Sequence, residues 1–204
     1  STSEVYGVGH GRPFQETDDS VYGPTTVARW SYAHSKAVDE HLAFALEQEL
    51  PSVVVRFFNT VGPRQRGDWG MVLPRFVQAA LTNAPIEVHG DGNQKRCFAD
   101  VRDIVDSLPR LLRSPDARGL PVNLGHDESI TILQLAELVR DVLNSESPIQ
   151  VLPYTEVWGR GFQDLQERIP DLARARNLVG LPPSRPLTET IQDLADCIRT
   201  EDSK

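Results

Sequence analysis

The sequence predicts an α/β fold, with part of a doubly wound parallel sheet and a smaller α/β region beside it. Stretches with a helical period alternate with short β-branched stretches, and this alternation is typical of βαβ units. One β-branched stretch, residues 52–58, is apolar almost without interruption. Continuous apolarity is typical of a strand that is covered on both faces, as in a parallel sheet.

The first predicted helix contains Tyr32 and Lys36 and runs to about Glu49. It follows a stretch rich in Gly, Pro and acidic residues, 7–26, which is typical of a loop. The apolar stripe expected to form its packing face consists of Val38, Leu42, Ala45 and Leu46. Tyr32 and Lys36 point about 100° away from that stripe, so they face either solvent or a ligand.

The later elements follow from the same patterns. Strands are predicted at 86–89, 121–125 and 149–152, and helices at 72–81, 102–112, from 132 onward, and on either side of 180–185. Asp100 is a candidate N-cap for the helix at 102–112. Residues 153–166 are predicted to be irregular.

Composition narrows the class of protein. The chain has 204 residues, 39% of them hydrophobic and 25% charged, which is ordinary for a soluble globular protein. A net charge of −8 argues against a nucleic-acid-binding surface. Cys97 and Cys197 lack metal-ligand spacing, so we expect no metal site and two reduced thiols in a cytoplasmic protein, a disulfide being the less favoured alternative. No apolar run is long enough to span a membrane.

Tyr32 and Lys36 can act as one chemical unit, because residues four apart share a helix face. A nearby ammonium group favours the phenolate and lowers the pKa of a tyrosine from its usual value of about 10. Tyr32 is therefore a candidate general acid or base. The spacing alone is a weak signal, since it also arises by chance.

Six short motifs occur in a defined order along the chain. They are 2–7 (with Val5-Tyr6-Gly7), Tyr32-x-x-x-Lys36, 56–64, 88–98, Asn123-Leu124-Gly125 and Arg168-x-Pro170-Asp171. In order and spacing they resemble the extended short-chain dehydrogenase/reductase family, in particular its NAD-dependent nucleotide-sugar epimerases, dehydratases and decarboxylases. The resemblance covers nearly the whole chain and rests on the six motifs together, since each alone is weak.

The resemblance implies catalytic roles. Tyr32 would take the proton from the sugar 4-hydroxyl while hydride leaves C4 for the nicotinamide of NAD, and Lys36 would lower the pKa of Tyr32. Thr2 would hydrogen-bond the reacting oxygen, and Glu4 belongs to the same catalytic motif. Phe58 would line the nicotinamide, beside Thr2, Tyr32 and Lys36. The alternative for Thr2 is a strand-end residue bonded to the backbone, and without the resemblance Phe58 would be a core residue.

The resemblance also implies a nucleotide-sugar site, for a UDP- or dTDP-sugar. It would be formed by Asn59, Val72, Phe76, Val88, His89, Arg96 and Arg168. The guanidinium forks of Arg96 and Arg168 suit the diphosphate and the sugar, because they bind such groups in bidentate fashion. A surface ion pair is the alternative for either arginine.

The cofactor half of the family pattern is absent from these 204 residues. The family's Gly-x-x-Gly-x-x-Gly turn, which holds the dinucleotide, does not occur, and Gly7-x-Gly9-x-Gly11 does not replace it. The chain thus resembles the C-terminal portion of such an enzyme, with an incomplete NAD site. Residues 1–63 would be the remnant of the Rossmann-type domain and 64–204 mainly the substrate domain, with about 97–125 returning to the former. The complete enzyme is expected to be a homodimer.

Thr2-Ser3-Glu4 bears on the reaction. The family's 4,6-dehydratases carry Thr-Asp-Glu here, and a serine hydroxyl is too weak an acid to replace that Asp. The sequence therefore favours 4-epimerisation, with decarboxylation of UDP-glucuronate second and dehydration third. A sugar-nucleotide-binding or interaction module without catalysis is the alternative from another class.

Overall fold

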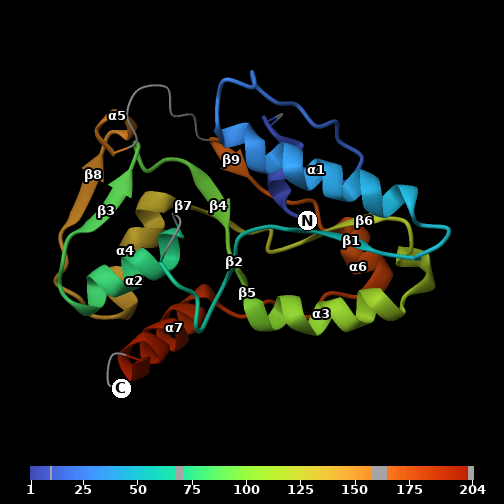
Figure 1. The fold of residues 1–204 in the computed structure, drawn as a ribbon. Helices are drawn as coiled ribbons and strands as arrows, with labels where there is room; N and C mark the ends of the chain where they lie inside the picture. Colours follow the sequence, from blue (N-terminus) through green and yellow to red (C-terminus); the bar gives the residue numbers. More distant parts are fainter. Residues whose placement is uncertain (10, 68–70, 158–164, 202–204) are drawn as a thin grey trace.

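The computed structural model describes residues 1–9, 11–67, 71–157 and 165–201. It confirms the predicted α/β architecture, with two groups of elements side by side (Figure 1). The helices are η1 (Ser3–Tyr6), α1 (Arg29–Ala45), α2 (Val72–Leu81), α3 (Val101–Arg113), η3 (Pro115–Ala117), α4 (Ile132–Val142), α5 (Tyr154–Val157), α6 (Ala173–Val179) and α7 (Leu187–Glu201). The strands are β1 (Val54–Phe57), β2 (Thr60–Val61), β3 (Ile86–His89), β4 (Lys95–Cys97), β5 (Ala99–Asp100), β6 (Pro121–Leu124), β7 (Ser129–Thr131), β8 (Ile149–Leu152) and β9 (Glu167–Arg168).

The first group is built on the parallel pair β1 and β6, in which Arg56 is the register partner of Asn123. Thr2 forms a parallel bridge with Phe57, so the chain start extends this sheet by one short segment. Figure 1 shows α1 on one side of the pair and α3 on the other. The first group therefore has the layered arrangement of a doubly wound sheet, and the carboxyl ends of its strands meet beside η1.

The second group is built on the parallel pair β3 and β8, which α2 and α4 cover, and α7 packs against these two helices. Its core is apolar, and the fully buried side chains include Leu73, Val77, Ile86, Val88, Leu135, Val139, Ile191 and Leu194. A three-stranded sheet of order β7-β4-β9 lies between the groups. Strand β4 pairs in parallel with β9, which makes Arg96 the register partner of Arg168.

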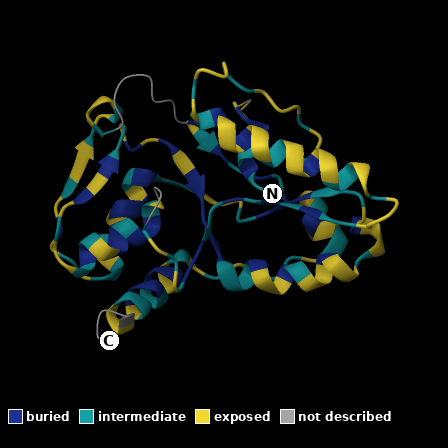
Figure 2. Cartoon of the chain, in the orientation of Figure 1, coloured by how far each residue is buried: buried dark blue, intermediate teal, exposed yellow. Residues whose placement is uncertain are grey.

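Helix α1 corrects the sequence prediction. It ends at Ala45 rather than near Glu49. Its buried residues are Trp30, Ala33 and Glu40, whereas three residues of the predicted packing stripe are exposed: Val38 by 56%, Leu42 by 58% and Leu46 by 46% (Figure 2). The helix thus packs on η1 through the opposite side, where Glu40 also pairs with Arg56 of β1.

Most other predicted elements are confirmed, including α2, β3 and β8 with the predicted bounds. Asp100 caps α3 by accepting a hydrogen bond from the backbone N–H of Arg102. The prediction of irregular structure for residues 153–166 is wrong at residues 154–157, which form α5. Residues 158–164 lie outside the described residues. Cys97 and Cys197 are not joined by a disulfide. Among the helices in the described part of the chain, none combines the length and apolar character that crossing a bilayer requires.

Candidate functional site

A cavity of about 880 Å³ lies between the two groups, at the carboxyl end of β1. In α/β sheets this end of the strands is where ligands bind. The cavity is lined by all but two of the residues that the sequence singled out. Those lining it are Thr2, Glu4, Tyr32, Phe58, Asn59, Val72, Phe76, His89, Arg96 and Arg168. Folding therefore gathers residues up to 166 positions apart, Thr2 and Arg168, around one space.

The two exceptions are Lys36 and Val88. Val88 is fully buried in the core of the second group, so β3 contributes the neighbouring His89 to the cavity instead. Lys36 bonds to Asp39, its Nζ lying 2.6 Å from Oδ2, and this hydrogen bond raises the pKa of Lys36. In this structure the ammonium group is therefore engaged on the outside of α1, and its action on Tyr32 stays a prediction.

Glu4 occupies the point where η1 meets β9. Its Oε1 lies 2.6 Å from Nη2 of Arg168, and its Oε2 lies 3.5 Å from Nη2 of Arg29. All three side chains are at most 20% exposed. Because desolvated charge-assisted contacts fix both partners, the cavity wall carries a carboxylate held between two guanidinium groups.

Thr2 and Tyr32 approach the cavity from η1 and α1. Thr2 is the N-cap of η1, and its Oγ1 accepts a hydrogen bond from the backbone N–H of Glu4 at 3.3 Å. Both lone pairs of a hydroxyl can accept and its proton can donate, so this bond leaves Thr2 able to donate to a ligand. Tyr32 is 53% exposed and lines the same space.

Phe58 and Asn59 follow directly after β1. Phe58 is 1% exposed and packs against Tyr6 and Phe14, so it is both a core residue and part of the cavity wall. Asn59 donates from Nδ2 to the carbonyl of Cys97 at 2.8 Å, which ties the end of β1 to β4.

The far end of the cavity is formed by β3, α2 and α5. Nη2 of Arg75 lies 3.2 Å from Nε2 of His89. Burial lowers the pKa of His89, and the charge of Arg75 lowers it further. Gln94 donates to the carbonyl of His89 at 2.7 Å and to the phenol of Tyr154 at 3.1 Å. Gly90 has φ +87°, and a Cβ there would lie 2.6 Å from the Tyr154 ring, so only glycine fits.

The cavity residues that the sequence did not single out include Arg29, Arg75, Gln94 and Tyr154. Arg29 and Arg75 had a usable signal, since Arg29 lies one helical turn before Tyr32 and Arg75 sits between the predicted Val72 and Phe76. Tyr154 lies in the stretch predicted to be irregular, and such a stretch does not indicate which way a side chain points.

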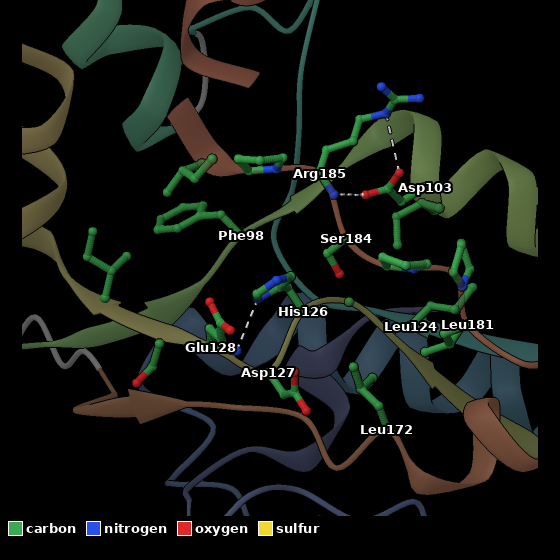
Figure 3. Close-up of a pocket in the computed structure, with 18 of the residues that line it drawn as sticks. Phe98, Asp103, Leu124, His126, Asp127, Glu128, Leu172, Leu181, Ser184 and Arg185 are labelled. Carbon is green, nitrogen blue, oxygen red and sulfur yellow. Dashed lines mark hydrogen bonds and ion pairs between the residues drawn. The ribbon is translucent and has the colours of Figure 1, made fainter. Parts of the chain in front are cut away.

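A second cavity, of about 1110 Å³, lies between α3, α4 and the segment before α7. None of the predicted site residues lines it. Figure 3 shows two separate polar pairs in it: Arg185 donates its backbone N–H to Asp103 at 2.8 Å, and His126 accepts from the backbone N–H of Glu128 at 3.0 Å. Asp127 pairs with Arg176 at 2.7 Å. The first cavity is therefore the candidate site.

Comparison with known proteins gives the family of the chain. A family model described as "NAD dependent epimerase/dehydratase family" matches residues 1–125. A UDP-N-acetyl-alpha-D-glucosaminuronate decarboxylase of Bacillus cytotoxicus is 38% identical over 199 residues, covering 94% of this chain and 61% of that protein. UDP-glucuronic acid decarboxylase 1 of Danio rerio is 38% identical over 191 residues, covering 93% of this chain and 44% of that protein.

The fold is shared with solved structures. A UDP-glucuronic acid 4-epimerase from Bacillus cereus, in complex with UDP-glucuronic acid and NAD, superposes with a TM-score of 0.84 at 24% identity, over 98% of this chain and 60% of that one. A UDP-N-acetylglucosamine 4-epimerase from Methanobrevibacter ruminantium, in complex with UDP-N-acetylmuramic acid, gives a TM-score of 0.85 at 25% identity, covering 98% and 62%. The chain thus spans roughly half of the length of these relatives.

Proposed function

The chain belongs to the NAD-dependent epimerase/dehydratase family, and from that premise we propose that it is the substrate-binding and acid-base part of an enzyme that decarboxylates a UDP-linked uronic acid. The observation that carries the proposal is the contact between Glu4 and Arg168 in the wall of the cavity. The names of the two curated relatives given above, both UDP-uronate decarboxylases, agree with it.

The residues present fit the reactive end of NAD. Thr2, Tyr32 and Phe58 line one cavity at the carboxyl end of β1, which offers two hydroxyl groups and an aromatic wall to the nicotinamide. A bound NAD would supply the hydride acceptor for C4 of the sugar. The Gly-rich phosphate-binding turn is not among the 204 residues, so this chain provides only that end of the cofactor site.

Oxidation at C4 turns a uronic acid into a β-keto acid. Tyr32 removes the proton of the 4-hydroxyl, and Thr2 donates a hydrogen bond to the same oxygen. When carbon dioxide leaves, the C5–C6 bond breaks and its electron pair moves toward the C4 oxygen, where Tyr32 and Thr2 stabilise the enolate. The proton that C5 then takes up comes from water, and Glu4, held as a carboxylate by Arg168, is placed to accept a hydrogen bond from that water and orient it.

The arginines explain why a uronate is the favoured substrate. Arg96 and Arg168 are register partners on β4 and β9, and both line the cavity. Guanidinium groups bind carboxylate and diphosphate in bidentate fashion. A nucleotide sugar with both a carboxylate and a diphosphate can therefore make more charged contacts with this wall than one whose sugar is neutral.

A second candidate is 4-epimerisation, the reaction that the sequence alone favours. It needs the same oxidation at C4, followed by rotation of the 4-keto sugar before hydride returns. A cavity of about 880 Å³ offers room for that rotation. Dehydration stays third, because Ser3 is 3% exposed and a weak acid.

The test completes the chain with the part of the Bacillus cytotoxicus relative that it does not match. The fusion is given UDP-glucuronate, UDP-N-acetylglucosaminuronate and dTDP-glucose separately, and products are identified by NMR. We expect carbon dioxide and a UDP-pentose from a uronate, and Glu4→Gln to lower kcat about 100-fold, within the range for lost acid-base catalysis. Glu49→Gln, at an exposed position, is the matched control.

Other products decide between the alternatives. A UDP-galacturonate product without carbon dioxide would establish epimerisation, and a 4-keto-6-deoxy product from dTDP-glucose would refute the reasoning from Ser3. Binding without turnover of any substrate would support the non-catalytic module.

The domain division is also a proposal. Two packing clusters support it: one joins β1, β6, α3 and α6, and the other joins α2, β3, α4 and α7. Residues 1–63 and about 97–125 would then belong to the cofactor side, and most of 64–204 to the substrate side. The homodimer and the cytoplasmic location stay predictions.

A further inference from the structure

Helix α1 carries a buried ion pair on its inner side. Glu40 is 6% exposed and Arg56, on β1, is 8% exposed. Arg56 donates from Nε to Oε1 of Glu40 at 3.0 Å and from Nη2 to Oε2 at 2.7 Å, so the contact is bidentate. Two parallel hydrogen bonds between planar groups fix direction as well as distance.

The position of Glu40 on the helix relates it to the catalytic residues. Tyr32, Lys36 and Glu40 follow one another at intervals of four, and each step turns by about 40° around the helix axis. Within α1, the side chains classed as buried are Trp30, Ala33 and Glu40, so Glu40 is the buried anchor of its second half. The rotation of the helix about its axis therefore depends on where this carboxylate is held.

We propose that the Glu40–Arg56 pair is a positioning device for Tyr32, fixing the rotation of α1 so that the phenol faces Thr2 and Phe58 across the cavity. The proposal rests on the proposed function, because it is there that Tyr32 moves the proton of the 4-hydroxyl. Neither Glu40 nor Arg56 lines the cavity, so the pair acts through the helix.

The surroundings of Arg56 make it a rigid support. Its guanidinium lies 4.7 Å from the centre of the Tyr6 ring, and the Tyr6 hydroxyl donates to Oδ1 of Asn123 at 2.5 Å. Asn123 is fully buried on β6, next to Arg56 in the strand register. Burial alone would lower the pKa of Arg56, but its hydrogen bonds to Glu40 and the nearby Tyr6 outweigh that and raise it, so the pair stays charged.

The same carboxylate connects α1 to the catalytic motif. Oε1 of Glu40 also accepts a hydrogen bond from the hydroxyl of Ser1 at 2.5 Å. Ser1 precedes Thr2, and Arg56 lies two residues before Phe58. One carboxylate thus sets the distance between the helix that carries Tyr32 and the two segments that carry Thr2 and Phe58.

A purely structural role makes a different prediction. Buried ion pairs replaced by apolar side chains of similar volume often leave the fold as stable as before or more so. Glu40→Met/Arg56→Met should therefore fold, yet lose the directional contact. If the pair only contributes packing, Tyr32 keeps its environment in this variant; if it positions the helix, Tyr32 moves.

The test uses the isolated chain labelled with 3-fluorotyrosine, without substrate or cofactor. The chain has four tyrosines, and Tyr32→Phe assigns the Tyr32 resonance in the fluorine NMR spectrum. In Glu40→Met/Arg56→Met we expect the Tyr32 resonance to shift by more than its linewidth or to split, while that of Tyr154, on α5, stays in place. Tyr6 contacts Arg56 directly and reports the substitution itself.

Two further variants keep the result interpretable. Arg185→Met/Glu189→Met removes an exposed pair at the start of α7 and should leave Tyr32 unchanged. Glu40→Gln keeps the side-chain volume and replaces the double variant as the test if the double variant fails to fold. We expect it to move the Tyr32 resonance as well. A Tyr32 resonance that coincides with that of the unaltered chain in a natively folded double variant would overturn the proposal. Since no turnover is measured, failure of the proposed function gives a separate result.

Discussion

The thiol of Cys97 is 1% exposed, and burial raises its pKa to about 12 from an ordinary value of 9.0. Because the folded state holds this proton more tightly than the unfolded state, the thiol's contribution to stability is complete below about pH 9. That contribution is lost progressively as the pH rises from 9 toward 12. A buried cysteine that takes no part in catalysis thus makes the whole chain sensitive to alkali.

Replacing Cys97 tests whether its thiol causes stability to fall as the pH rises. We expect the free energy of unfolding of the unaltered chain to fall by about 1 kcal/mol between pH 9 and 10 from this group, somewhat less than the value of one pKa unit because the unfolded thiol is already half ionised at pH 9. In Cys97→Ala the fall in the free energy of unfolding that is due to this thiol should vanish. The smaller side chain lowers stability by the same amount at every pH, so it does not affect the comparison. Urea unfolding at pH 8, 9 and 10 measures it, with Cys197→Ala as the control. An equally steep loss in Cys97→Ala would contradict the assignment.

The residues of the site show what a sequence can and cannot predict at this scale. Thr2, Tyr32 and Arg168 were found because each belongs to a motif, and the structure brings all three to one cavity. The salt bridge between Glu4 and Arg168 was not foreseen, since it joins residues 164 positions apart whose meeting depends on the pairing of β9 with β4. Periodicity and local motifs contain no information on such a pairing.

At the scale of elements, α2, β3 and β8 were predicted with their bounds because each is a continuous pattern flanked by turn residues. Strands β4, β7 and β9 were missed, since they are only two or three residues long and exist through hydrogen bonds to distant partners. The packing face of α1 was wrong for a different reason. Its most apolar stripe is exposed, and its buried side includes the charged Glu40, which Arg56 neutralises.

The exposed stripe of α1 predicts how the chain behaves in solution. Val38, Leu42 and Leu46 form a row of apolar side chains, each at least 46% exposed. Contiguous exposed apolar surface promotes association. We expect the isolated chain to self-associate, and Leu42→Glu to shift it toward the monomer, as measured by sedimentation velocity over a 100-fold range of concentration.

The control for this prediction is Leu112→Glu, because Leu112 is a single side chain on α3 that is 75% exposed. It adds the same charge without interrupting the α1 stripe. A concentration-independent monomer for the unaltered chain, or equal effects of the two substitutions, would contradict a role of the stripe in association.

At the scale of the whole molecule, the proposed function would give the chain two sites of unequal completeness. The proposed nucleotide-sugar side would be built by α2, β3, β4 and β9, all of which the structure describes and which line one cavity. The proposed cofactor side would have Thr2, Tyr32 and Phe58 for the nicotinamide, but the 204 residues hold no Gly-rich turn for the diphosphate. Dinucleotides owe much of their affinity to such a turn and to the helix N-terminus behind it.

The two ligands should therefore bind this chain very differently. We expect titration calorimetry to detect a UDP-sugar with micromolar to millimolar affinity and to give no saturable signal with NAD in the same range. Arg96→Ala should weaken UDP-sugar binding at least tenfold, because a buried guanidinium bound to phosphate contributes more than about 1.4 kcal/mol, whereas Arg113→Ala, on the outer end of α3, should leave it unchanged. Sub-micromolar binding of NAD would show that residues of this chain hold the diphosphate without the Gly-rich turn, and the division of the two sites would then have to be redrawn.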